Sequence, residues 1–561
     1  MNNQNTIRVN VIGHGEHEIE QGTTLQALSE RFSFPRTILV AKKNNELKEL
    51  YNPLRYDCTV EFLDISDANG YRVYQRSASY LMIYAVKKVL AGRGKSIKQS
   101  RVVIAHSINK NFYCELPDLG EPVTDELLAE IETVMKDAVT QNLKIEKVSL
   151  PLETGLRIAA EMGMDDKVEL LKYRRTSAVN FYKLDGFYDY FYGRMAPNTG
   201  CLQSFKLTRR FNGFLLQFPA ASHDYALAEA APNTKISEVF EESNQWARAL
   251  NIDTVGSLNN KLCTSGIGEV IRVTEALHEK KIANLADQIM QDHKRIVLIA
   301  GPTSSGKTTF AARLSVQLRV NGVQPYVISL DNYYVNREHT PKDADGKPDL
   351  ETIKAIDVAQ INKDMSALLK GETVQIPSYN FLTGQREYKG HYLTLKPDDV
   401  LIVEGIHGLN GAIGEGISRD DTFRIFISAL TQINIDDHNR IPTTDTRLVR
   451  RIVRDHQFRG YSADKTIEIW PSVVRGEGNY IFPFQEEADA FFNSALVYEM
   501  CVLKQFAEPL LFGIGKEHPS YTEARRLIKF LDGFLGATSE SVPINSILRE
   551  FVGGSCFGHG H

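Results

Sequence analysis

Gly301-Pro302-Thr303-Ser304-Ser305-Gly306-Lys307-Thr308 is the stretch that decides the fold. It fits the phosphate-loop pattern G-x-x-x-x-G-K-[ST] in full. The preceding residues 295–300 form a short apolar run typical of a buried parallel strand, and residues 308–320 place apolar side chains at helical spacing. Strand, glycine-rich turn and helix in this order present backbone N–H groups and a helix N-terminus to phosphates. We therefore expect Gly301 to Thr309 to bind nucleotide phosphates, rather than to form a coincidental glycine turn.

Two residues of this loop have expected roles of their own. Lys307 is expected to reach the β- and γ-phosphates, and the Thr308 hydroxyl is expected to hold Mg²⁺.

Two acidic residues follow apolar strands elsewhere in the same half of the chain. Asp331 comes after the apolar run 326–330, and Glu404 ends the apolar run 400–404. The carboxyl ends of parallel strands face the ligand in open α/β sheets. Asp331 is thus a candidate proton acceptor for a substrate hydroxyl and a candidate Mg²⁺ contact, and Glu404 a candidate Mg²⁺ ligand. A turn aspartate and an ordinary strand end are the alternatives.

Seven arginines occur between residues 440 and 475. Four of them repeat at intervals of three and four and therefore share a helical face, namely Arg447, Arg450, Arg451 and Arg454. Such a face suits a lid that closes over transferring phosphates, because guanidinium groups bind spread negative charge. A solvated face paired with acids is the alternative interpretation.

Residues 295 to about 475 resemble the uridine kinases, within the larger uridine kinase and phosphoribulokinase group. The pieces that carry the resemblance are the phosphate loop and residues 331–334, 375–381, 403–405 and 445–451. The resemblance implies an α/β kinase domain with a P-loop NTPase-type parallel sheet, and ATP and Mg²⁺ as cofactors. It implies catalytic roles for Lys307 and Asp331, metal contacts for Thr308, Asp331 and Glu404, and lid contacts for Arg450 and Arg454. It also implies that Tyr334, Tyr379 and Phe381 line the acceptor pocket.

The departures from that family concern the acceptor. Lys354 stands where the family has an aspartate that binds ribose hydroxyls, Gly384 where it has a histidine that reads the pyrimidine, and Ile469 where it has a glutamine that contacts the ribose. About ten extra residues, around 431–440, precede the D-T-R motif. A site that loses its hydroxyl-pairing groups loses much of its discrimination. Lys354 is therefore expected to contact the substrate and to suit an anionic acceptor.

The front half resembles modules of threonyl-tRNA synthetases. Residues 7–66 alternate as half-buried strands around a short helix expected at Thr23 to Phe32, and resemble the ubiquitin-like TGS domain. Residues 69 to about 220 resemble the editing domain, most clearly at 197–200 and 205–207. The family's four ligand-type positions fall on Tyr80, Tyr84, Phe191 and Met195, which cannot replace imidazole and thiolate. We infer an α+β editing-like fold without editing chemistry, and a structural role for His106 and Cys114.

These assignments divide the chain at 1–68, 69–222, 223–290 as a helical linker, and 291–561 as the kinase domain. The net charge of −5 over 561 residues does not indicate a nucleic-acid-binding protein, which is usually strongly basic. The polar start, scattered cysteines and absence of a long apolar run favour a cytoplasmic protein with reduced thiols, no secretory signal and no membrane partner.

The sequence thus predicts an ATP- and Mg²⁺-dependent kinase for a hydroxyl on a small molecule, with a nucleoside as the best single guess. Another small alcohol or an anionic metabolite remains open as the acceptor. A nucleotide-dependent tRNA- or ribosome-associated regulator is a second interpretation, and a scaffold that holds subunits together is a third. We expect a homo-oligomer and do not favour a nucleic-acid partner.

Overall fold

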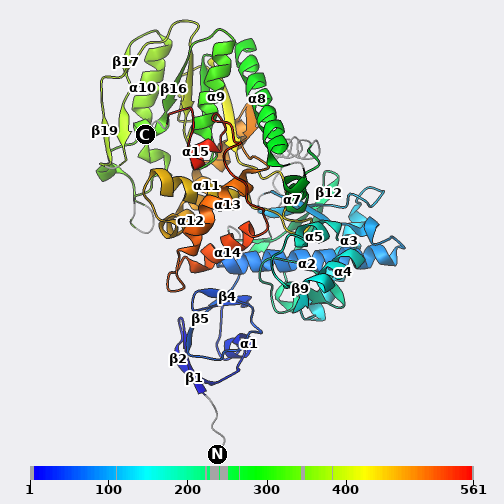
Figure 1. Ribbon diagram of the computed structural model, residues 1–561. Coiled ribbons are helices and arrows are strands. Elements are labelled where there is room, and N and C mark those ends of the chain that lie inside the picture. The colour runs from blue at the N-terminus through cyan, green and yellow to red at the C-terminus, as the bar shows by residue number, and fades with distance from the viewer. Residues whose placement is uncertain are drawn as a thin grey trace, which may run out of the picture.

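The computed structural model describes residues 6–108, 110–221, 224–227, 235, 239, 250–264, 266–342, 346, 348–381 and 383–558. Figure 1 shows three parts along the chain: a small N-terminal sheet, a middle part rich in helices, and a large part built around a second five-stranded sheet. Within the described ranges, no helix has both the length and the apolar character needed to cross a bilayer. The six cysteines are all free thiols.

The N-terminal part is a five-stranded sheet in the order β2-β1-β5-β3-β4. Its elements are β1 (Thr6–Val11), β2 (Gly15–Glu20), α1 (Leu25–Ser29), β3 (Val40–Lys43), β4 (Glu46–Lys48) and β5 (Cys58–Leu63). The helix is shorter than the predicted Thr23–Phe32, and its N-cap is Thr24, whose side chain accepts a hydrogen bond from the Ala27 amide. Thr23 lies one residue before the N-cap, and its hydroxyl donates instead to the Glu20 carbonyl at 2.7 Å.

The middle part combines two antiparallel sheets with helices. The sheet β11-β12-β7-β6 packs against α2 (Ala68–Gly92) and α3 (Asp125–Thr140), and the sheet β10-β9-β8 against α4 (Leu152–Glu161). Their strands are β6 (Val103–Ile108), β7 (Asn111–Glu115), β8 (Glu146–Pro151), β9 (Ala178–Leu184), β10 (Phe187–Asp189), β11 (Lys206–Arg210) and β12 (Gly213–Gln217). Helix α5 (Asp165–Leu171) precedes β9 in the chain. The two-stranded pair β13 (Pro219–Ala220) and β14 (Ala226–Leu227) and helix α7 (Val255–Thr264) follow β12. Most of 228–249, in the linker predicted as helical, lies outside the described residues.

The large part confirms the predicted parallel sheet. Its strand order is β16-β21-β15-β22-β23, with every neighbouring pair parallel. The strands are β15 (Ile296–Ala300), β16 (Pro325–Ser329), β21 (Val400–Glu404), β22 (Thr422–Ser428) and β23 (Ala490–Asn493). Val297 and Ile299 pack on the side of α8 (Ile267–Gln291) and α9 (Lys307–Val320), while Ile296 and Leu298 pack on the side of α10 (Val358–Leu369). Both faces are covered, which explains the continuous apolar runs of the strands.

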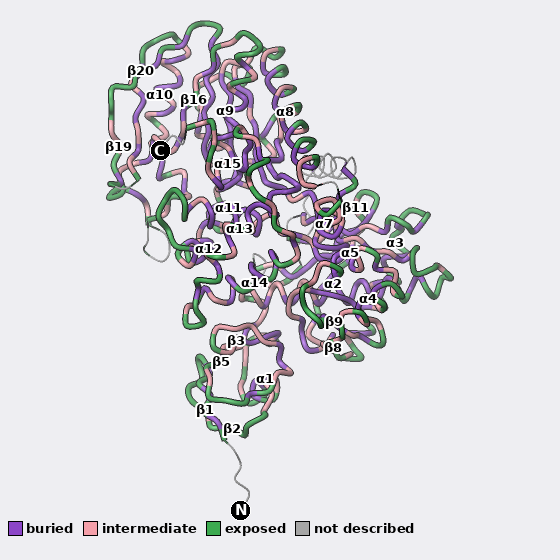
Figure 2. Tube along the Cα trace, in the orientation of Figure 1, coloured by how far each residue is buried: buried purple, intermediate pink, exposed green. Residues whose placement is uncertain are grey.

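The remaining helices form a layer below the sheet, as Figure 1 shows. They are α11 (Thr443–Phe458), α12 (Ala463–Tyr480), α13 (Glu499–Phe512), α14 (Tyr521–Leu531) and the short α15 (Arg549–Val552). Two short ladders join β17 (Val374–Gln375) with β20 (Tyr392–Leu393) and β18 (Ser378–Asn380) with β19 (Gln385–Glu387). Figure 2 shows buried chain concentrated along the sheet and around α11 and α13. Helix α11 is therefore an interior element.

The ten extra residues around 431–440 dock the large part onto the middle part. Asp437 pairs with Arg101 at 2.7 Å, and its carbonyl accepts from the Ile104 amide. His438 Nδ1 lies 2.8 Å from Lys167 Nζ and 2.8 Å from Asp189 Oδ2. An insertion that the sequence shows only as a departure from a family pattern is thus a structural joint.

Candidate active site

The phosphate-loop residues connect β15 to α9 in the predicted arrangement. Gly306, the N-cap of α9, has φ of 84°, a conformation that residues with a side chain rarely adopt. At Gly301 a Cβ atom would lie 2.1 Å from the Ile427 carbonyl oxygen, so only glycine lets the two chains approach. The loop thereby begins close to β22 and ends at the N-terminus of α9, the kind of position at which anions bind.

Lys307 and the two acidic residues meet beside this loop. Lys307 Nζ donates to the Pro302 carbonyl at 3.2 Å. Burial lowers the pKa of Lys307, and the negative charges of Glu404 and Asp331 oppose that shift. Burial raises the pKa of Glu404 to about 7, assisted by Asp331 and opposed by Lys307. The predicted lysine and both carboxylates therefore belong to one electrostatic cluster.

The oxygen atoms in this cluster fit a magnesium ion by their chemistry. Thr308 Oγ1 donates to Glu404 Oε1 at 3.4 Å, and Asp331 lies in the 3₁₀ turn that follows β16. A hydroxyl and two carboxylates are hard oxygen donors of the kind that Mg²⁺ prefers, with several waters retained. Thr308, Asp331 and Glu404 are the residues that would hold the ion.

The arginines of α11 do not form a solvated face. Arg447 is 1% exposed and Arg450 0%. Arg447 pairs with Glu477 at 2.5 and 2.7 Å and donates to the Thr303 carbonyl at 3.1 Å. Arg450 pairs with Glu499 and donates to the Ser304 carbonyl at 3.2 Å. The solvated-face interpretation is wrong, because the acids that neutralise these arginines are buried with them.

Two other arginines of the same helix reach the side chains of the loop. Arg451 donates to Thr303 Oγ1 at 3.3 Å, and Arg454 donates to Ser304 Oγ at 3.1 Å. Burial lowers the pKa of Arg454 to about 10, and the neighbouring Arg459 adds to the effect. The helix thus offers two pairs of arginines with different surroundings: Arg447 and Arg450 hold the backbone of the loop, and Arg451 and Arg454 face its hydroxyl groups.

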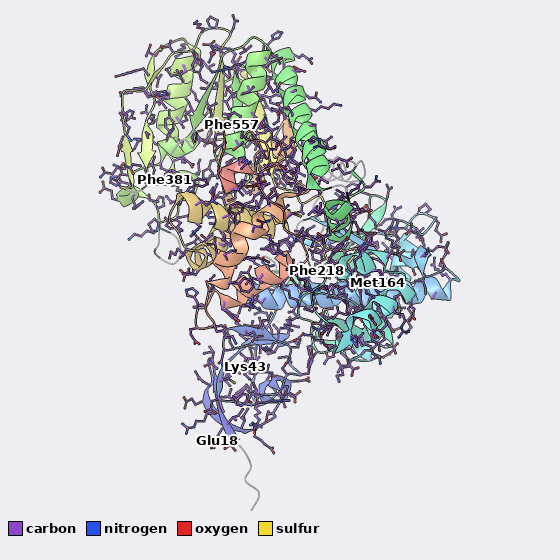
Figure 3. All side chains as sticks on the ribbon, viewed as in Figure 1. Glu18, Lys43, Met164, Phe218, Phe381 and Phe557 are labelled. Atoms are coloured by element: carbon purple, nitrogen blue, oxygen red, sulfur yellow. The ribbon has the colours of Figure 1, made fainter. Side chains whose placement is uncertain are left out.

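The predicted acceptor residues split between an aromatic cluster and an exposed lysine. Ring centroids lie 5.5 Å apart for Tyr334 and Tyr379, and 5.0 Å apart for Tyr379 and Phe381. Phe381 is 41% exposed, and Figure 3 labels it at the outer edge of the large part. Lys354 is exposed on the 3₁₀ turn Ile353–Ala355. The aromatic side chains therefore come together as predicted, and the lysine is not drawn into their cluster.

Gly384 cannot be exchanged for a residue with a side chain in this backbone. Its φ is 72°, and an added Cβ would lie 2.7 Å from Cβ of Arg337. Arg337 Nη2 donates to the Phe381 carbonyl at 2.5 Å. A cation thus occupies the space beside Gly384, next to the aromatic cluster. No spacing in the sequence links Arg337 to this position, so sequence reasoning missed it.

Two partly buried carboxylates near the site were also missed. Burial, with the charge of Glu477, raises the pKa of Glu351 to about 7, and its Oε2 has no hydrogen-bond partner among the described residues. Glu550, on α15, accepts from Thr309 Oγ1 at 2.9 Å and pairs with Arg454 at 3.4 Å. Figure 1 shows α15 beside α9. Glu550 lies far along the chain from every motif, which is why no sequence signal pointed to it.

The editing-like positions of the middle part are filled by apolar packing. Tyr80, Tyr84, Phe191 and Met195 all belong to its buried core. The Tyr80 hydroxyl lies 2.8 Å from two backbone carbonyls. Among the described residues, the one group of three ligand-type side chains is Asp464, Glu468 and His518, so His106 and Cys114 stand apart from any such group.

Comparison with known proteins supports both halves of this description. The model of the phosphoribulokinase and uridine kinase family matches residues 296–499. A uridine kinase from Macrococcus caseolyticus is 30% identical over 195 residues, which cover 35% of this chain and 85% of that protein. The chain belongs to the phosphoribulokinase and uridine kinase family. Its phosphate loop, Asp331 and Glu404 lie within the matched range.

The N-terminal region is similar to a different group of proteins. A threonine–tRNA ligase from Acetivibrio thermocellus is 28% identical over 204 residues, which cover 36% of this chain and 31% of the ligase. The chain therefore spans about a third of the length of the ligases that it matches. A solved structure described as a possible uridine kinase from Bacillus stearothermophilus is 18% identical and covers 38% of this chain and 98% of that chain, with a TM-score of 0.27.

Proposed function

We propose that this member of the family is an ATP- and Mg²⁺-dependent kinase that transfers the γ-phosphate to a hydroxyl of a small molecule. The observation that carries the proposal is the meeting of Lys307, Asp331 and Glu404 beside the phosphate loop. We also propose that the division at 1–68, 69–222, 223–290 and 291–561 confines this chemistry to the last part.

The roles of the residues follow from their charges and positions. Asp331 accepts the proton of the acceptor hydroxyl as the oxygen attacks the γ-phosphorus, and the bond from that phosphorus to the β,γ-bridging oxygen breaks to release ADP. Lys307 and Arg454 stabilise negative charge on the phosphoryl oxygens, in a buried site where such interactions are strong. Bound Mg²⁺ would neutralise charge on the β- and γ-phosphates. Arg450 is a positioning residue in this scheme, because its guanidinium is paired with Glu499 and holds the Ser304 carbonyl.

A nucleoside is the best candidate acceptor, giving its 5′-monophosphate. Its support is the aromatic cluster of Tyr334, Tyr379 and Phe381, on which a base can stack. The cations Lys354 and Arg337 at this side of the site favour the alternative of an anionic acceptor, such as a phosphorylated sugar.

Phosphate transfer from labelled ATP to a panel of nucleosides, sugars and sugar phosphates tests the proposal. Transfer to uridine or cytidine supports the nucleoside. If only phosphorylated acceptors react, the anionic alternative holds, and Lys354→Ala should then weaken their use. Transfer to no acceptor on the panel would contradict the proposed reaction.

The similarity to threonine–tRNA ligases favours a second candidate, a nucleotide-dependent regulator that binds tRNA. Filter binding of tRNA over a range of salt concentrations tests it, since binding to phosphates weakens steeply as salt rises. Absence of binding at low salt would reject this candidate.

A further inference from the structure

A basic cavity lies where the three parts of the chain meet. Its volume is about 390 Å³, and its walls come from β4, the first half of α2, residues 192–194 and α14. Figure 1 shows β4, α2 and α14 converging at this place, away from the phosphate loop. Six cationic side chains line it: Arg72, Arg76, Arg194, Arg525, Arg526 and Lys529. Two acids, Glu46 and Asp532, line it as well.

The acids around the cavity neutralise only part of this charge. Glu523 bridges Arg72 at 2.9 Å and Arg526 at 2.7 Å, and Arg194 pairs with Glu49 at 3.2 Å. These pairs satisfy three of the six cations.

The other three cations have no carboxylate partner among the described residues. Arg76 donates to the Arg194 carbonyl at 2.8 Å, and Arg525 lies over the ring of Phe512 at 5.8 Å. Lys529 is exposed to the cavity. Burial by the surrounding protein lowers its pKa to about 7, and the nearby Arg194 and Lys147 add to the effect. The positive charge of Arg76 and Arg525, and that of Lys529 in its protonated form, is therefore available to a ligand.

The dimensions and chemistry of the cavity define a class of ligand. Small-molecule sites in proteins have volumes of about 300–1,000 Å³, and the cavity falls in this range. Guanidinium groups that converge from several elements suit phosphate oxygens, because each fork can donate two hydrogen bonds. A ligand that binds all three of these cations must carry more than one negative charge. We propose that this cavity is a binding site for a small molecule that carries two or more phosphate groups.

The cavity is also connected to the arginine helix of the active site. Arg526 donates to both carboxylate oxygens of Asp445, at 2.6 and 2.7 Å. Asp445 lies in the first turn of α11, two residues before Arg447, which holds the Thr303 carbonyl of the phosphate loop. A polyphosphate that binds Arg526 would therefore contact a residue that is hydrogen-bonded to α11, the helix that also holds the phosphate loop through Arg447. The binding itself is independent of the proposed kinase reaction.

Calorimetric titration of the full chain with inorganic pyrophosphate and tripolyphosphate tests the proposal. All titrations use the Lys307→Met background, which weakens binding of these anions at the phosphate loop. Lys529→Met and Arg76→Gln remove cavity cations that have no carboxylate partner, and exposed Lys280 on α8 supplies the control Lys280→Met. We expect saturable binding that each cavity variant weakens about tenfold or more, equivalent to about 1.4 kcal/mol or more, and that the control leaves unchanged.

Three results would overturn the proposal. The first is no saturable binding in the Lys307→Met background. The second is equal binding in the cavity variants and the control. The third is saturable binding of bulk tRNA that depends on the cavity cations, while pyrophosphate and tripolyphosphate do not bind. Circular dichroism spectra of the variants establish that each one is folded.

Discussion

Replacement of Lys167 by methionine should lower the free energy of unfolding, because Lys167 joins the middle part of the chain to the large part. Its ammonium group lies 3.1 Å from Asp189 and 3.2 Å from Asp436, and all three side chains are 0% exposed. Burial alone would lower the pKa of Lys167, but the two aspartates outweigh that effect and raise it. Lys167 lies on α5 of the middle part, whereas Asp436 belongs to the docking insertion of the large part. The lysine thus links a carboxylate of the middle part to a carboxylate of the large part inside the joint.

The expected loss of stability follows from what the substitution leaves behind. Methionine retains most of the packing volume but leaves two buried carboxylates without their shared counter-charge. Breaking a buried ion pair in this way costs about 3–5 kcal/mol. Total stabilities are about 5–15 kcal/mol, so the loss is a large fraction of the whole.

Urea unfolding, followed by far-UV circular dichroism and tryptophan fluorescence, measures this loss. Lys280→Met is the matched control, because its side chain is exposed on α8. Adding Asp436→Asn to Lys167→Met should restore part of the stability, since it removes one of the unpaired charges. A loss of less than about 1 kcal/mol for Lys167→Met would refute the reasoning, because it would lie well below the expected cost. A double variant no more stable than the single one would refute it as well.

Three further predictions concern the site itself. Because the pKa of Glu404 is raised to about 7, its carboxylate is mostly protonated at pH 6 and mostly ionised at pH 8. Activity at subsaturating Mg²⁺ should therefore rise about tenfold between these two pH values. This pH dependence should vanish in Glu404→Gln. Glu550→Gln removes a negative charge 2.9 Å from the Thr309 hydroxyl and should tighten binding of a fluorescent ATP analogue about tenfold; unchanged or weaker binding would show that Glu550 does not oppose nucleotide phosphates. Arg447→Met leaves Glu477 buried without its partner and should lower the free energy of unfolding by about 3–5 kcal/mol in a urea titration, with wild-type stability as the contradicting result.

Local patterns predicted the phosphate side of the site because its information is local. The loop, its strand and its helix are contiguous, and Asp331 and Glu404 each follow a recognisable apolar strand. Parallel strands place their carboxyl ends on one edge of the sheet, so these residues had to come together once the sheet formed.

The groups that were missed depend on contacts between distant segments. Glu550 reaches Thr309 across 241 residues, and Lys167 reaches His438 across 271. Arg337 occupies the space beside Gly384 only because two loops meet in the folded chain. The burial of Arg447 and Arg450 could not be predicted either, since a helical face of arginines looks the same whether its acidic partners lie in the interior or at the surface.

The central claim is that the phosphate loop, Asp331 and Glu404 carry out phosphate transfer, and the most direct test is the rate of that transfer in Asp331→Asn. The measurement uses labelled ATP, Mg²⁺ and the best acceptor of the panel, with exposed Asp398→Asn as the matched control. The account predicts that Asp331→Asn lowers the rate about 10²–10⁴-fold while ATP binding is retained, and that the control remains at the wild-type rate. Equal rates in Asp331→Asn and wild type would contradict the account.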